Sequence, residues 1–202
     1  MSNVLVIKTS ILGGYSQSSK LIDEFVDGLT TKYPATKVVV RDIGAEPLPY
    51  LDGELVGGLR GGDAELTPRQ QGAAALSDTL IAELKAADYV VVAVPMYNFG
   101  IPVQLKSWFD LICRAGITFS YSETGPKGHI TGKKVLVVTT TGGAHRNTAT
   151  DLALAHAQAV LGFVGMTETT VAYAEALNMG PDAQEKGLAS ARETIKAFLS
   201  TI

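Results

Sequence analysis

The sequence predicts an α/β protein built on a doubly wound parallel sheet of five strands. Four short apolar runs, at residues 4–7, 38–40, 89–94 and 135–138, are rich in β-branched residues, and none alternates with polar residues. This pattern is typical of strands that are buried on both faces of a parallel sheet. A weaker run at 167–173 is the fifth candidate strand. Helical patterns separate the runs, and the alternation of strand and helix favours this fold class.

The first helix is expected directly after the first strand. Ser16 is suited to cap it, because a serine hydroxyl accepts a hydrogen bond from a free N–H of the first turn. The apolar stripe of this helix comprises Leu21, Phe25 and Leu29, with Ile22 and Val26 beside it. At this spacing the side chains share one helix face, which we expect to pack on the sheet.

The remaining helices have starting points of their own. Residues 67–70, Thr-Pro-Arg-Gln, form a capping box with proline at the first helical position, and this helix should run to about Ala87. Pro102 opens a helix after the third strand, with Leu105, Trp108, Phe109 and Ile112 on one face. Residues 151–161 and 181–199 predict the last two helices, one before and one after the fifth strand.

Two long stretches, 43–66 and 116–132, are predicted to be irregular because proline and glycine interrupt them repeatedly. Long loops inside a compact domain are usually functional or bind a partner. Large apolar side chains occur in both stretches, among them Leu48, Tyr50, Leu51, Leu55, Val56, Phe119 and Tyr121. Two interpretations are open: these side chains line a homodimer interface, or they fold back over their own core.

Composition narrows the function classes. The 202 residues are 46% hydrophobic and 18% charged, and no linker or repeat divides them, so we expect one domain, 1–202. Nucleic acid and anionic membranes are not expected as partners, because both need clustered Lys and Arg and the net charge is −3. The run at 4–7 is too short for a signal peptide or membrane span, so a cytoplasmic protein is expected. The single cysteine, Cys113, excludes an intramolecular disulfide and a cysteine-cluster metal site, and we expect no metal.

The ligand site is expected where the order of the strands reverses. In an open parallel sheet, ligands bind outside the carboxyl ends of the strands at such a switch point. Three loops with unusual content, 9–19, 95–101 and 139–147, follow the first, third and fourth strands. This arrangement fits the strand order 2-1-3-4-5, whose switch point lies between strands one and three.

The first of these loops predicts an anion site without a cation. The segment SILGGYSQSS, residues 10–19, contains four serines, two glycines and no charged residue. Hydroxyls at Ser10, Ser16 and Ser18, together with the free N–H groups of a helix start, suit one terminal monophosphate. Neither a dinucleotide glycine fingerprint nor a Walker loop is present. The alternative is that Ser16 only caps the helix and the other serines have no ligand.

The second and third loops suit a flat heteroaromatic ring. Residues 96–99, Met-Tyr-Asn-Phe, place aromatic and apolar side chains at a strand end, and Asn98 adds amide donors and an acceptor. Residues 139–143, Thr-Thr-Thr-Gly-Gly, offer hydroxyls and unhindered backbone N–H groups. Ordinary core packing of Tyr97 and Phe99 is the alternative.

With these residues in place, the sequence resembles the FMN-dependent NADH-azoreductases, also called FMN-dependent NADH:quinone oxidoreductases. The resemblance rests on the segments Ser16–Ser18, Pro95–Phe99 and Thr141–Gly143, with residues 52–57 and 104–106 as further similarities. It implies a flavodoxin-like fold, a homodimer, and one non-covalent FMN per subunit near the dimer interface. It also implies a ping-pong transfer of two electrons from NADH or NADPH, through flavin N5, to quinones and azo compounds.

The resemblance also implies roles for individual residues. Carried over by position, the FMN-binding residues are Ser10, Ser16, Gln17, Ser18, Met96, Tyr97, Asn98, Phe99, Thr140, Thr141, Gly142 and Gly143. Some members carry Ser and Arg where this chain has Thr140 and Thr141, so neither position contributes a charge to substrate preference here. Independently of the resemblance, the candidate substrate-binding residues are Phe119, Tyr121, Phe163 and Arg60, the last for the phosphates of NAD(P)H. The alternatives are simple packing for the three aromatic residues and a solvated side chain for Arg60. Apart from the resemblance, the location of His145 after the two glycines makes it a candidate catalytic residue: it either donates a proton or only hydrogen-bonds the flavin or substrate.

Two other function classes remain open from the sequence. A flavodoxin-like carrier would pass single electrons to a protein partner, but such carriers tend to be shorter and strongly acidic, unlike this chain. A nicotinamide-binding regulator would have an acidic residue after its second strand, and Asp42 is at that position. Such a regulator also expects the glycine fingerprint, which is absent here.

Overall fold

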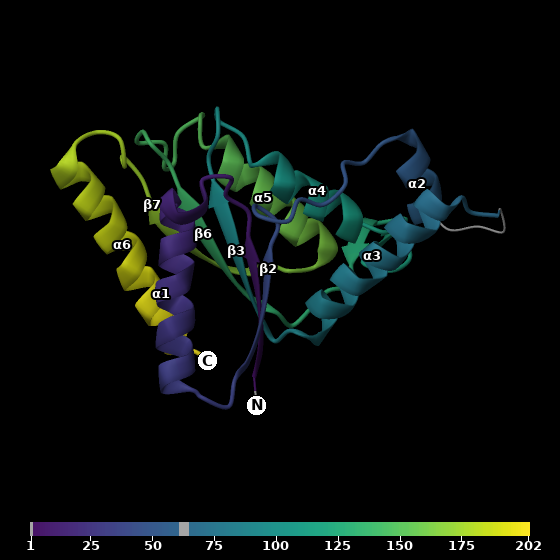
Figure 1. Cartoon of the computed structure of the whole chain (residues 1–202), viewed down its shortest axis with the longest axis horizontal. Coiled ribbons are helices and arrows are strands. Elements are labelled where there is room, and N and C mark those ends of the chain that lie inside the picture. The colour runs from purple at the N-terminus through teal and green to yellow at the C-terminus, as the bar shows by residue number, and fades with distance from the viewer. Residues whose placement is uncertain (1, 61–64) are drawn as a thin grey trace.

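The computed structural model describes residues 2–60 and 65–202, and its centre is a five-stranded parallel sheet (Figure 1). The order of the strands is β2-β1-β3-β6-β7. These strands are β1 (Asn3–Lys8), β2 (Lys37–Asp42), β3 (Tyr89–Pro95), β6 (Lys134–Thr140) and β7 (Glu168–Ala174). They are the five runs predicted from the sequence, so the predicted flavodoxin-like order 2-1-3-4-5 is confirmed.

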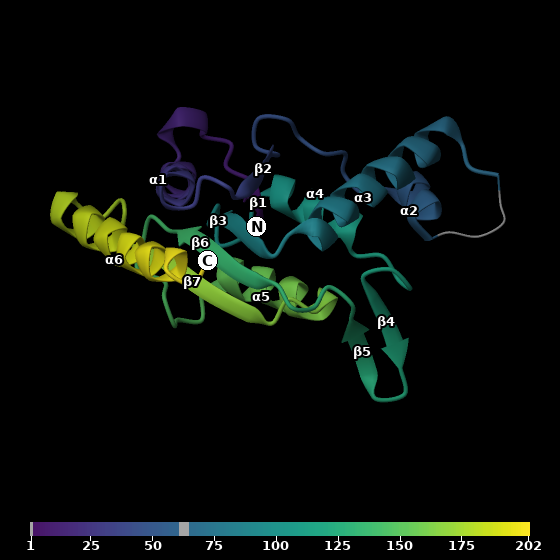
Figure 2. The ribbon, with the colours of Figure 1, turned by 90° about the horizontal axis from the view of Figure 1, so that it is seen from below.

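Helices cover both faces of the sheet (Figures 1 and 2). The six helices of the described residues are α1 (Gln17–Lys32), α2 (Gly53–Arg60), α3 (Pro68–Ala86), α4 (Val103–Ile112), α5 (Leu152–Val164) and α6 (Pro181–Leu199). Alternate side chains of a strand point to opposite faces. Leu5 and Ile7 therefore join one apolar cluster with α3, α4 and α5, whereas Val4 and Val6 join another with α1 and α6.

The predicted helix starts are confirmed in detail. The Ser16 hydroxyl accepts a hydrogen bond from the Ser19 N–H at 3.1 Å, as an N-cap should. Thr67 and Gln70 form both bonds of the capping box: the Gln70 N–H donates to Thr67 Oγ1 at 3.3 Å, and the Thr67 N–H donates to Gln70 Oε1 at 2.9 Å. These local bonds fix where α1 and α3 begin, and the start of α1 belongs to the site described below.

The second strand is not buried on both faces as predicted. β2 lies at the edge of the sheet, and each of its side chains is exposed or half-buried. Val40 is 50% exposed. An apolar run of three valines therefore indicated a strand correctly but did not distinguish an edge strand from a central one.

The prediction of an irregular segment at 43–66 is wrong over 53–60, where α2 forms; residues 61–64 lie outside the described residues. The glycine content of α2 hid it, since glycine disfavours helices. Long-range contacts stabilise it instead. Arg69 on α3 forms ion pairs with Asp52, just before α2, at 2.6 Å and with Glu54 at 2.7 Å. Gly58 is close enough to the Gln70 backbone that any side chain at 58 would collide with it.

The prediction of an irregular segment at 116–132 is also wrong in part. A hairpin of β4 (Phe119–Ser122) and β5 (Gly125–Gly128) projects from the body of the protein (Figure 2). Its base is anchored by a close backbone contact, because a Cβ added at Gly128 would lie 2.2 Å from the Gly165 nitrogen after α5. Such proximity depends on tertiary packing, which a local sequence pattern does not reveal.

The apolar side chains of these two segments are divided between core and surface. Leu48, Leu55 and Phe119 are buried against their own chain, as the fold-back interpretation expects. Tyr50 and Tyr121 are 59% and 75% exposed in the single chain. Among residues 2–60 and 65–202, none of the helices is both long and apolar enough to span a membrane.

Candidate functional site

A cavity of about 290 Å³ lies at the carboxyl ends of the strands, at the predicted switch point. Its lining comes from four segments that are distant in sequence: the loop after β1 with the start of α1, the loop after β3, the loop after β6, and the loop after β7 with the start of α6. The lining residues are Ser10, Leu12, Tyr15, Ser16, Gln17, Pro95, Met96, Tyr97, Thr140, Thr141, Gly142, Leu177, Asn178 and Gln184. None of them carries a formal charge.

The start of α1 forms the donor-rich end of this cavity. The Ser16 and Ser18 hydroxyls lie 3.1 Å apart, and both side chains are buried. Ser16 already satisfies the Ser19 N–H, but the N–H groups of Gln17 and Ser18 donate to no other described residue. Free first-turn N–H groups together with the positive end of the helix dipole attract an anion.

The loop after β3 is a tight turn in a strained conformation. Tyr97 and Gly100 exchange two backbone hydrogen bonds, of 2.9 and 3.0 Å. Asn98 and Phe99 between them have φ angles of 50° and 69°, a region that residues other than glycine seldom adopt. The turn leaves Phe99 51% exposed, so Phe99 is not an ordinary core residue.

Tyr97 links this turn to the loop after β1. Its hydroxyl lies 2.7 Å from the Ser10 hydroxyl, across two neighbouring strands. The Met96 N–H donates to the Thr140 carbonyl at 2.9 Å, which extends the pairing of β3 and β6 by one residue. The three predicted loops are therefore joined to one another at this edge of the sheet.

The loop after β6 is held from behind by the loop after β7. The N–H groups of Ala176, Leu177 and Asn178 donate to the carbonyl oxygens of residues 143, 141 and 142, at 3.0, 3.1 and 2.9 Å. All three carbonyls of the turn are thereby engaged. The N–H groups of Gly142 and Gly143 have no acceptor among the described residues. The turn thus presents donors rather than acceptors to a ligand.

Neighbouring polar groups occupy the places where side chains of the two glycines would be. A Cβ built on Gly142 would lie 2.6 Å from Asn178 Nδ2, and one built on Gly143 would lie 2.8 Å from His145 Nε2. The imidazole of His145 also packs edge-on against Phe99, with ring centroids 5.7 Å apart. Glycine at 142 and 143 therefore makes room for an amide and an imidazole beside the turn.

Several residues predicted from the sequence do not line the cavity. Ser18 lies behind Ser16, and Asn98, Phe99, Gly143 and His145 lie beside the cavity on the loops described above. Arg60 is the exposed last residue of α2. Phe119 contacts both Phe163 and Tyr121, with ring centroids 4.3 and 5.6 Å apart. This aromatic cluster lies where the hairpin meets α5 rather than among the cavity residues.

The sequence analysis missed the contribution of the loop after β7. Leu177, Asn178 and Gln184 complete the cavity, and the Gln184 side chain donates to the Leu177 carbonyl at 3.3 Å. The rule that ligands meet the carboxyl ends of the strands already pointed to this loop, because it follows the fifth strand. The loop has no distinctive motif, and it therefore received no prediction.

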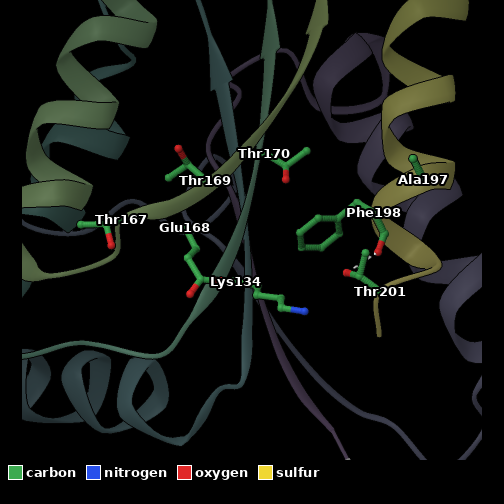
Figure 3. A pocket seen from close by; sticks show the side chains of 8 residues that line it. All are labelled: Lys134, Thr167, Glu168, Thr169, Thr170, Ala197, Phe198 and Thr201. Carbon is green, nitrogen blue, oxygen red and sulfur yellow. Dashed lines mark hydrogen bonds between the residues drawn. The ribbon is translucent and has the colours of Figure 1, made fainter.

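A larger pocket, of about 500 Å³, lies at the other end of the sheet (Figure 3). Lys134 and residues 167–170, near the starts of β6 and β7, line it together with Phe198 and Thr201 at the end of α6. The Thr201 hydroxyl is already engaged with the Phe198 carbonyl at 2.8 Å. This pocket faces away from the carboxyl ends of the strands, so its size does not make it the better candidate.

Known proteins are similar to this chain in both fold and sequence. Residues 2–199 match the family described as having a flavodoxin-like fold. The chain is 66% identical over 200 residues to an FMN-dependent NADH:quinone oxidoreductase of Tolumonas auensis, covering 99% of each chain. It is 52% identical over 200 residues to the protein of the same name from Cronobacter sakazakii, covering 99% of this chain and 100% of that one. The chain belongs to the family of FMN-dependent NADH:quinone oxidoreductases.

A solved structure of an azoreductase is similar to this chain in fold. The azoreductase from Bacillus anthracis str. Sterne superposes with a TM-score of 0.91 and 28% sequence identity, and the match covers 100% of both chains. The resemblance of the sequence to FMN-dependent NADH:quinone oxidoreductases and azoreductases is therefore confirmed over the whole chain.

Proposed function

We propose that this protein is an FMN-dependent oxidoreductase that passes two electrons from NADH to quinones and azo compounds. The observation that carries the proposal is the strand-end cavity, whose uncharged donor set fits one monophosphate at one end and a flat ring at the other. The names of the relatives from Tolumonas auensis and Cronobacter sakazakii support FMN and NADH, and the azoreductase neighbour supports azo substrates.

The donor-rich end suits the phosphate of FMN. We assign to it the hydroxyls of Ser10 and Ser16, the Gln17 side chain, and the free N–H groups at the start of α1. The buried Ser18 hydroxyl contributes through its 3.1 Å contact with that of Ser16. Hydroxyls and N–H groups are the donors that an oxyanion needs, and the helix dipole replaces a cation. Lys8 does not supply one, since its ammonium is paired with Asp23 at 2.5 Å.

The opposite end suits the ring. We assign to it Met96, Tyr97, Thr140, Thr141 and Gly142, which line the cavity, and Asn98, Phe99 and Gly143, which lie beside it on the same loops. Tyr97 also reaches the phosphate end, because its hydroxyl lies 2.7 Å from that of Ser10. FMN, once bound, supplies the hydride chemistry. The N–H groups of Gly142 and Gly143 have no acceptor among the described residues and can stabilise negative charge at the edge of the ring, as an oxyanion hole does.

The finer features of the family complete the proposal. We propose a single domain spanning 1–202, a homodimer in the cytoplasm, and a ping-pong mechanism in which NADH or NADPH leaves before the acceptor binds. The exposed Tyr50 and Tyr121 support an interface that the single chain leaves uncovered. Through it, we propose, Tyr121 and Arg60, which are exposed, reach the substrate space of the partner, and Phe119 and Phe163 support Tyr121 from the base of the hairpin.

Steady-state kinetics test this proposal against the electron-carrier alternative. The protein with FMN should oxidise NADH rapidly when a soluble quinone is the only acceptor and no partner protein is present. Double-reciprocal plots at several quinone concentrations should give parallel lines, as a ping-pong mechanism requires. NADH oxidation that needs an added protein would support the carrier, and intersecting lines would contradict the ping-pong order.

A further inference from the structure

His145 takes part in a closed chain of hydrogen bonds that involves two threonines of its own loop. Its Nδ1 lies 2.8 Å from the Thr150 hydroxyl, and that hydroxyl lies 2.8 Å from the Thr148 hydroxyl. The Thr148 hydroxyl in turn donates to the backbone carbonyl of His145 at 2.7 Å. The chain therefore begins at the carbonyl of His145 and ends at the ring of the same residue.

Counting protons fixes the direction of every bond in this chain. A carbonyl oxygen only accepts, and each threonine hydroxyl has one proton to donate. The proton of Thr148 is used on the carbonyl, so the proton of Thr150 must be used on Thr148. The third contact, between Thr150 and His145, then has no proton left from a hydroxyl, and Nδ1 must donate. The opposite arrangement would leave two lone pairs facing each other at hydrogen-bond distance.

The neutral imidazole is therefore the Nδ1–H tautomer, and Nε2 carries a lone pair. The hydrogen bond made by one ring nitrogen decides the protonation of the other: because Nδ1 donates to Thr150, Nε2 of the neutral ring carries no proton. Nε2 lies beside Gly143, in the place that a side chain at 143 would take, and the edge-on contact with Phe99 holds the ring there. Nε2 has no partner among the described residues, so it is free to accept from a ligand.

Charged groups near His145 are engaged elsewhere. The Arg146 N–H donates to the Glu175 carboxylate at 3.1 Å, and the Arg146 guanidinium lies over the Tyr173 ring, 5.7 Å from its centroid. No ion pair joins His145 to an acidic side chain within the described ranges. The hydroxyl chain, rather than a carboxylate, is the structural feature that orients this imidazole.

We propose that Thr148 and Thr150 are positioning residues that hold His145 as a hydrogen-bond acceptor at Nε2. The ligand group that meets Nε2 must then be a donor, such as the phenolic hydroxyl of a hydroquinone, and not the carbonyl of a quinone. The tautomer follows from this chain alone, whereas the nature of the ligand rests on the proposed oxidoreductase function.

Long-range ¹H–¹⁵N correlation spectra of histidine-labelled protein test the tautomer, at a pH high enough for the ring to be neutral. A His145→Gln variant identifies the resonances of His145. In the unaltered protein, the ¹⁵N chemical shift of Nδ1 should be that of a protonated nitrogen, and the shift of Nε2 should be that of an unprotonated nitrogen. The shifts of His129 and His156 in each variant are the internal control for folding.

Three variants make the test specific to the direction of the hydrogen bonds. Thr148→Val removes a hydroxyl that does not touch the ring, but it frees the Thr150 proton to donate to Nδ1, so the tautomer should switch to Nε2–H. Thr150→Val should also lose the Nδ1–H tautomer, because Nδ1 then has no acceptor, whereas Thr150→Ser should retain this tautomer. A protonated Nε2 in the unaltered protein would overturn the proposal, as would a Thr148→Val variant that keeps Nδ1–H.

Ligand binding tests the second part of the proposal. Hydroquinone and its dimethyl ether have similar shapes, but only hydroquinone donates hydrogen bonds. In the Thr150→Val variant, Nε2 should no longer accept a hydrogen bond from the hydroquinone hydroxyl. We therefore expect hydroquinone to bind the oxidised, FMN-loaded variant about five- to tenfold more weakly than the unaltered protein. The affinity for the dimethyl ether should be equal in the two proteins. If the variant and the unaltered protein bind hydroquinone with equal affinity, or if neither binds it, the proposed role of Nε2 is wrong. NADH–quinone activity measured on the same samples tests the proposed function separately.

Discussion

Ser16 has two roles in this account, and substitutions can separate them. It caps α1 through its bond from the Ser19 N–H, and we assign its hydroxyl to the phosphate of FMN. Aspartate and asparagine are N-caps as good as serine, whereas alanine is not. Ser16→Asp and Ser16→Asn therefore keep the cap, have nearly the same size, and differ in one negative charge.

The size of the effect follows from Coulomb's law. A carboxylate at position 16 would lie about 4 Å from the phosphate, and at an effective dielectric constant of about 20 each pair of unit charges repels by about 4 kcal/mol. This corresponds to a loss of affinity on the order of 1,000-fold relative to Ser16→Asn. Ser16→Ala should lose about 1 kcal/mol of stability with its cap, which the other two variants keep.

Two measurements on each variant separate these effects. Titration of apoprotein with FMN, followed by the quenching of flavin fluorescence, gives the dissociation constant, and thermal unfolding of the apoprotein gives the stability. We expect Ser16→Asp to be as stable as Ser16→Asn but to bind FMN far more weakly. Equal FMN affinity of these two variants would refute the placement of the phosphate at the start of α1.

Further predictions concern stability and chemistry away from the site. Gly128→Ala should destabilise the protein by about 1–3 kcal/mol in urea unfolding, since the new Cβ would lie 2.2 Å from backbone at the end of α5. Gly72→Ala, in an open position on α3, is the control and should stabilise by about 0.5–1 kcal/mol; equal effects would contradict this packing. Burial raises the pKa of the Cys113 thiol from 9.0 to about 11, so iodoacetamide should label the native protein about 100-fold more slowly than the unfolded chain, and equal rates would show an exposed thiol. Hydrogen bonds from Arg69 hold the pKa of Asp52 at about 2, below its usual 3.8, so the ionised Asp52 stabilises the contact of α2 with α3 above pH 4 and this contribution is lost as the pH falls towards 2. In NMR titrations, Arg69→Gln should return the Asp52 pKa towards 3.8, and an unchanged value would exclude this cause.

The parts of the fold that could be predicted depend on local chemistry. A capping box or an N-cap serine involves residues three positions apart, so Thr67 and Ser16 correctly predicted where their helices begin. The strands β1, β3 and β6 were found because buried parallel strands are continuously apolar, whereas β2 and β7, which are more exposed, were found from their β-branched residues. The parts that were missed depend on distant contacts. Helix α2 depends on its contacts with α3, which include the ion pairs of Arg69 and the packing of Gly58 on Gln70, and the hairpin depends on the approach of Gly128 to Gly165.

The same distinction applies to the site. The serine loop, the Met96–Phe99 turn and the glycine turn were predicted because each contains an unusual local pattern at a strand end, and the structure brings residues from all three to one cavity. Asn178 was missed because it is distant from Gly142 in the sequence, although its side chain occupies the place that a side chain at 142 would take. The hydroxyl chain of His145 was missed because the direction of its bonds becomes visible only with the three distances in hand.

The visible spectrum of the purified protein tests the central claim most directly. We predict the absorption bands of bound FMN, removed together with the cofactor when Ser16 is replaced by Asp. Addition of one equivalent of NADH without air should bleach these bands, and one equivalent of a quinone should restore them. A colourless protein that takes up no FMN, or bound flavin that NADH leaves unbleached, would contradict the account.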